Sequence, residues 1–164
     1  MRGLIYLLLI VNASACIAAE DEFLKFSPES EYFGSPAAPL LDTKNKRRFR
    51  TVLRNGAQEP ANFNGHYRII YWGCGANCIS WAIVDQKSGA VWMAPHISES
   101  CWPFKRDYDP NAYIPDWFES KVQSSLFYSY VCSNPDGNFT FNIRHIYVWK
   151  NGKPQLLRSK NVSY

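Results

Sequence analysis

The chain has 164 residues, the length of a single domain, and carries a modest net charge of +4. Hydrophobic residues make up 46% and charged residues of both signs 20%, which argues against a disordered chain, and a mean hydropathy of −0.30 excludes several membrane spans. Aromatic residues reach 16%, which favours strands over helices, and the small charge gives no reason to expect a nucleic-acid partner.

The first 19 residues have the layout of a secretory signal peptide. Arg2 precedes an apolar run at 4–11, and small residues dominate 13–19. The run is too short to cross a bilayer as a helix, and no second run of spanning length follows. Cleavage after Ala19 is the favoured route; the alternative is a lipid anchor on Cys16, because 13–16 resembles a lipobox that lacks the usual Leu. We expect a periplasmic or secreted protein.

An oxidising compartment gives the remaining cysteines a structural meaning. Cys74, Cys78, Cys101 and Cys132 form an even set, so two disulfides are expected. Four cysteines allow three connectivities, and Cys74–Cys78 with Cys101–Cys132 is preferred. The first of these bonds needs a tight turn, since the cysteines would be too far apart in an extended strand.

Between the signal peptide and the first regular element, residues 20–42 contain prolines and no hydrophobic period, which predicts a flexible lead-in. The domain is then expected at 43–164. At 46–55, apolar residues fall on one helical face, and Gly56 is interpreted as the cap that ends this short helix. Basic residues on the helix face solvent or an anionic surface: Arg47, Arg48 and Arg50.

Alternating patterns dominate the rest of the chain. Runs at 66–72, 79–85 and 90–94 predict an antiparallel meander with a turn at 86–89. A proline- and aromatic-rich loop follows at 95–122, with one or two helical turns near 116–123. Further strands are expected at 126–132, 139–149 and 155–158. The predicted fold is therefore α+β: one short helix on a mainly antiparallel sheet of five or six strands, stapled by disulfides.

Three motifs together resemble a group of bacterial exported proteins of unassigned activity. That group shows the pattern N-F-A-G-H-Y, then W-G-C-G-x-x-C, then A-I-V-D-x-x-T-G-x-V; here the matching runs are 62–67, 72–78 and 82–91. Asn64 replaces the usual Ala and Ser88 the usual Thr. The resemblance implies a bacterial, exported location but does not indicate any activity. The segment around Cys101 has no counterpart in the pattern.

A cysteine-dependent hydrolase of the envelope is one functional hypothesis. Cys74 or Cys78 would be the nucleophile, His66 or His145 the base, and Asp85 would orient the base. Exported thiols with cysteine neighbours normally oxidise, so the hydrolase is the alternative hypothesis and not the preferred one. No metal or cofactor is expected, because the histidines lack ligand spacing.

The preferred hypothesis is a non-enzymatic envelope protein that binds another macromolecule, such as an inhibitor or an immunity protein, with a protein or a wall glycan as partner. A passive structural component is the third possibility. The expected binding surface combines the three arginines with an aromatic platform, of which core packing would claim about half. The platform consists of Trp92, Trp102, Tyr108, Tyr113, Trp117 and Phe118.

Overall fold

The computed structural model describes residues 21–75, 78–94, 98–99, 117–133 and 140–161. Its described elements are mostly antiparallel strands with few helices, which confirms the expected α+β class. The strands form two sheets and not the single sheet of five or six strands that we predicted. Alternation shows that a run is a strand but not which sheet it joins, so the sequence pattern could not separate the two.

The first sheet contains the expected meander. It consists of β1 (Tyr67–Gly75), β2 (Cys78–Asp85) and β3 (Val91–Met93), paired in that order, with the short β4 (Ser98–Glu99) also on β2. The β2–β3 turn ends at Gly89, whose φ is +77°. A Cβ there would lie 2.3 Å from the carbonyl oxygen of Ala38, so the turn accepts glycine alone.

The second sheet is a four-stranded antiparallel ladder in chain order. It consists of β5 (Phe118–Ser120), β6 (Leu126–Ser133), β7 (Thr140–Lys150) and β8 (Lys153–Asn161). The expected helical turns near 116–123 are wrong at their centre, because 118–120 pairs with β6 instead. Asn151 and Gly152 both have positive φ, as a two-residue hairpin with a type I′ turn requires.

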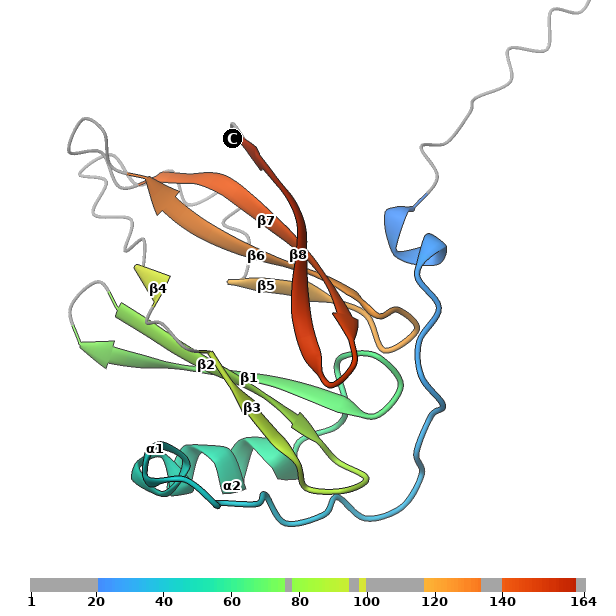
Figure 1. Cartoon of the computed structure of the whole chain (residues 1–164), viewed down its shortest axis with the longest axis vertical. Coiled ribbons are helices and arrows are strands. Elements are labelled where there is room, and N and C mark those ends of the chain that lie inside the picture. The colour runs from blue at the N-terminus through green and yellow to red at the C-terminus, as the bar shows by residue number, and fades with distance from the viewer. Residues whose placement is uncertain (1–20, 76–77, 95–97, 100–116, 134–139, 162–164) are drawn as a thin grey trace, which may run out of the picture.

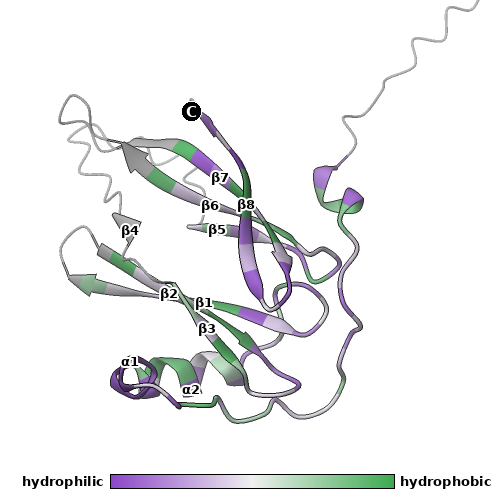
Figure 2. Cartoon of the chain, in the orientation of Figure 1, coloured by the Kyte–Doolittle hydropathy of each residue, from purple (hydrophilic) through white to green (hydrophobic). Residues whose placement is uncertain are grey.

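The two sheets pack face to face, and the helices cover the outer face of the first sheet (Figure 1). Alternate residues of the central strands therefore enter different cores. Ile69 and Ile83 face the second sheet, whereas Ile70 and Val84 face the helices. In Figure 2 hydrophobic residues lie on β1, β2 and the adjoining helix, and also along the strands of the second sheet. The intersheet core is aromatic: Phe63, Tyr67, Trp81, Phe127 and Trp149 are all buried in it.

The predicted helix is present but differs at both ends. Thr43 caps α1 (Lys44–Arg48) by accepting a hydrogen bond from the Lys46 backbone, and α2 (Arg50–Gln58) follows after Phe49. Gly56 lies inside α2, so its interpretation as the cap is wrong. A Cβ at Gly56 would lie 2.7 Å from the Ile70 side chain, which shows that this glycine lets the helix approach β1 closely.

The segment before the helices, which the sequence predicted to be a flexible lead-in, contacts both sheets in the described residues. It begins with the short 3-10 helix η1 (Glu22–Lys25), whose Phe23 is buried against Tyr128 and Ile146 on the outer face of the second sheet. The chain then runs extended past both sheets to α1 (Figure 1). Backbone hydrogen bonds from residues 37 and 40 to the β2–β3 turn fix its far end.

Candidate functional site

The structure separates the residues of the hypothetical cysteine hydrolase. His66 immediately precedes β1 and Asp85 ends β2, and the register places them side by side, with His66 Nε2 3.5 Å from Asp85 Oδ1. Cys74 lies eight residues further along the extended β1, which corresponds to roughly 25 Å. Cys78 pairs with Gly75 at that same distant end. The histidine thus has a carboxylate partner but neither of these cysteines within reach.

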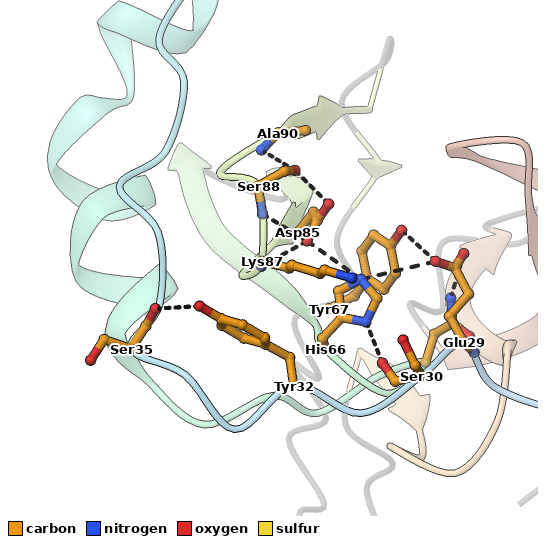
Figure 3. Close-up of polar contacts among 11 residues, drawn as sticks. Glu29, Ser30, Tyr32, Ser35, His66, Tyr67, Asp85, Lys87, Ser88 and Ala90 are labelled. Atoms are coloured by element: carbon orange, nitrogen blue, oxygen red, sulfur yellow. Dashed lines mark hydrogen bonds and ion pairs between the residues drawn. The ribbon is translucent and has the colours of Figure 1, made fainter.

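The carboxylate cluster around His66 fastens the N-terminal segment to the first hairpin (Figure 3). His66 Nδ1 donates a hydrogen bond to the Ser30 carbonyl oxygen at 2.7 Å. His66 Nε2 lies between the carboxylates of Asp85 and Glu29, and its distance to Glu29 Oε2 is 3.9 Å. The imidazole stacks on Tyr67 and is only 4% exposed. A buried ring whose two nitrogens face protein groups has no free position for a substrate, so this arrangement is structural.

Asp85 likewise makes hydrogen bonds to neighbouring residues of its own turn. Its carboxylate accepts hydrogen bonds from the backbone N–H of Lys87 and Ser88 and from the Ser88 hydroxyl. Ser88 therefore faces the acid and not His66, so the three residues do not form a serine–histidine–acid relay, in which the serine must contact the imidazole.

His145 lies in the other sheet, on β7, where its Nδ1 is 2.7 Å from Ser159 Oγ on β8. Burial lowers the pKa of His145, which favours the neutral ring. Within the described residues, no group of three or more His, Cys, Asp or Glu side chains is placed to hold a metal ion.

Of the cysteines, Cys74 is the one whose side chain the structure describes, and it is disulfide-bonded. Cys78 and Cys132 occur on β2 and β6, but their side chains, like Cys16 and Cys101 as a whole, lie outside the described residues. The predicted disulfide pairing, Cys74–Cys78 with Cys101–Cys132, therefore remains a prediction.

The expected aromatic platform is divided between core and surface. Trp92 packs on the buried Trp81 with ring centroids 5.0 Å apart and belongs to the intersheet core. Trp117 precedes β5 and accepts a backbone hydrogen bond from Tyr130. Phe118 is half-buried and reaches the surface, whereas the remaining members lie outside the described residues: Trp102, Tyr108 and Tyr113.

The predicted basic residues of the helices are mostly engaged with their own segment. Arg47 donates to the backbone oxygens of Leu41 and Asp42, and Arg48 lies over the ring of Phe49. Arg50 is exposed at the first position of α2. These contacts support a solvated surface more than a concentrated anion site.

A hollow that the sequence did not reveal opens between the edge strands of the two sheets. Its volume is about 460 Å³, and strands β1 and β5 contribute most of its wall. Tyr71, 44% exposed, and Phe118 form an aromatic side with ring centroids 5.6 Å apart. Volumes of this order are typical of ligand sites. The other lining residues are Gly56, Asn62, Arg68, Ile69, Ile70 and Ser120.

Arg68 gives this hollow a positive charge without a compensating carboxylate among the described residues. Its Nη1 donates to the Pro60 carbonyl oxygen at 2.8 Å, while its Nε is buried and has no hydrogen-bond partner. A partly buried guanidinium with an unmade hydrogen bond is costly unless an anionic or carbonyl group completes it. The sequence did carry a signal: Arg68 lies on the β1 face that holds Ile70 and Trp72, where an apolar residue is expected.

No family model matches the chain, and neither a curated protein nor a solved structure is significantly similar to it. None of the helices in the described part of the chain is long and apolar enough to cross a membrane. The functional argument therefore depends on the geometry of the chain itself.

Proposed function

We propose that this protein is an exported, non-enzymatic binding protein of the cell envelope and that the hollow between β1 and β5 is where it holds its partner. The observation that carries this proposal is Arg68, whose guanidinium lines the hollow and whose buried Nε has no hydrogen-bond partner among the described residues. Two aromatic rings, Tyr71 and Phe118, line the same hollow. Arg and Tyr are the residue types that contribute most to binding at protein interfaces.

Export and two disulfides belong to the same proposal. The signal-peptide layout of 1–19 and the even number of later cysteines support them, as does the oxidised state of Cys74. We expect Cys74–Cys78 and Cys101–Cys132, cleavage after Ala19, and no lipid on Cys16. The intact mass of the exported chain, alkylated with and without reduction, reads all of these together. A lipid mass or a free thiol would contradict them.

The hydrolase alternative is weaker because of where its residues lie. Cys74 is oxidised and lies at the far end of β1 from His66, and a disulfide sulfur has no free thiolate to act as a nucleophile. A passive structural role, the third possibility, does not account for an arginine in the hollow that has no carboxylate partner among the described residues. An inhibitor or immunity role is consistent with binding through such a site. It predicts that the protein binds its partner in a stoichiometric complex.

The test is capture of envelope proteins and wall glycans by the exported chain and two variants. Arg68→Gln keeps a polar side chain of similar length but removes the charge, and we expect about a tenfold loss of the captured partner. Arg54→Gln is the matched control, because Arg54 is exposed on α2, two positions before Gly56 and hence on the opposite helix face. Equal capture by all three proteins would refute the hollow as the binding site.

A further inference from the structure

The hollow borders the outer edge of β1, and the register shows which backbone groups face it. Tyr67 exchanges backbone hydrogen bonds with Phe63, and Ile69 bonds to the Asn62 side chain, so both residues point their N–H and C=O away from β2. Because these directions alternate along a strand, Tyr71 and Gly73 point their backbone groups the same way, whereas Ile70 and Trp72 face β2.

Residues of the same chain already pair with the first part of this edge. The Asn62 amide donates to the Ile69 carbonyl at 3.2 Å and accepts from its N–H at 2.8 Å, the two bonds that a neighbouring strand would make there. Beyond that point the edge is open: no described residue forms a hydrogen bond with the backbone of Tyr71 or Gly73 on their outward side. Among the described residues, the row of backbone donors and acceptors therefore continues without partners where the hollow lies, beside Tyr71.

From this edge we infer that the partner's bound segment is an extended peptide that adds as a strand to β1 at Tyr71 and Gly73 and brings an acidic side chain to Arg68. The inference rests on the proposed function and names the partner's chemistry. Main-chain pairing at an open sheet edge supplies affinity, and pockets beside the edge select alternate side chains. Here the pocket is positively charged on one side and aromatic on the other.

The register of an added strand assigns the two side chains. A residue opposite Tyr71 shares its face and contacts the rings of Tyr71 and Phe118, so an apolar residue fits there. Its neighbour, opposite Ile70, lies on the face of Arg68 and diagonal to it, within reach of a long side chain. A carboxylate at that position would complete the guanidinium hydrogen bonds, because Arg and carboxylate match in geometry and charge.

The experiment selects short linear peptides from a random library against the exported chain and then measures backbone amide exchange with an enriched peptide bound. We expect enriched peptides to pair an acidic residue with an adjacent apolar one and to lack proline. Binding should slow exchange at Tyr71 and Gly73 by about tenfold or more, while Ile70 and Trp72, already bonded to β2, change little. When the same library is selected for binding to the Arg68→Gln variant, the enriched peptides should lose the preference for an acidic residue and keep the preference for an apolar one.

A backbone variant tests strand addition without touching the pocket. Gly73→Pro removes the outward N–H and obstructs an incoming strand, and proline is tolerated at outward-facing positions of edge strands. Gly73→Ala is its matched control, because a Cβ there meets nothing within 4 Å. We expect peptide binding to be lost in the first and kept in the second. Slow exchange at Tyr71 and Gly73 in the free protein would overturn the inference, since the edge would then be filled by the chain itself.

The outcomes separate this inference from the proposed function. Envelope capture that depends on Arg68 without protection of Tyr71 and Gly73 would keep the binding site and overturn strand addition. If Arg68→Gln captures as much partner as the unmodified chain and no peptide is enriched, both the hollow as the binding site and strand addition would be overturned.

Discussion

Replacing Gly56 by Ala tests how α2 is seated on the first sheet. In an exposed helix interior this change stabilises by about 1 kcal/mol, because alanine is the better helix former. Here the added Cβ would lie 2.7, 2.8 and 2.9 Å from three side-chain carbons of Ile70, which is buried and β-branched. No rotation of a stiff isoleucine removes three contacts at once, and overpacking of this kind costs about 1–3 kcal/mol. We expect a net loss of about 1 kcal/mol.

The decisive measurement is a double-mutant cycle by denaturant unfolding under oxidising conditions. In an Ile70→Ala background the space opposite Gly56 is open, so Gly56→Ala should change sign and stabilise by about 1 kcal/mol. The coupling energy between the two sites should thus be about 2 kcal/mol. Gly152→Ala is a useful comparison, because its φ of +70° makes alanine costly for backbone reasons with nothing within 4 Å. A loss at Gly56 that is independent of residue 70 would refute the packing argument.

Three further predictions concern the edge, the buried ring of Tyr67 and the partly buried ring of His145. Asn62→Asp removes the donor to the Ile69 carbonyl and should cost about 1–3 kcal/mol in urea unfolding, whereas Asn45→Asp on exposed α1 should cost little. Burial raises the pKa of Tyr67 from 10.0 to about 12, so its neutral form stabilises the fold below pH 10 and that stability is lost toward pH 12; Tyr67→Phe should flatten this fall. Burial lowers the pKa of His145, so stability should decline as the pH falls below its ordinary value of 6.5, and less steeply in His145→Gln.

Alternation predicted β1, β2 and β6 well because each of these strands has at least one buried face. β5 and β8 have no buried residue, and there the bounds or the type of the element differed from the prediction. The meander at β1 to β3 follows directly from runs such as 79–85, in which odd and even residues enter different cores. The same pattern could not assign strands to sheets. Leu126 and Phe127 are adjacent and both buried, one under the N-terminal segment and one between the sheets, and only the third dimension explains why.

The N-terminal segment and the hollow escaped prediction for a related reason. Residues 21–43 bury Phe23 and Pro39, pack Phe26 and Leu41 partly against the cores, and otherwise bind through backbone groups and single contacts such as Glu29 to Asn64. These scattered contacts leave no period in the sequence. The hollow depends on which strands are at the edges, and strand order is a tertiary property. Arg68 within an otherwise apolar strand face is the available sign in the sequence, but alternation alone does not distinguish it from an ordinary exposed position.

The edge strands β1 and β8, one in each sheet, differ in their protection, and this contrast strengthens the case for a functional edge at β1. Proteins protect exposed edge strands with charges and proline, because unpaired backbone groups recruit other chains. The β8 edge carries Lys153, Pro154, Arg158 and Lys160 along its length, around an exposed leucine pair. On β1, by contrast, Asn62 closes the edge at Ile69, and the stretch beyond it consists of Tyr71, Trp72 and Gly73, with neither charge nor proline. Within the described residues, the edge is closed up to the border of a charged hollow and open beyond it, which is what a site for an added strand requires. Gly73→Pro would remove this open donor.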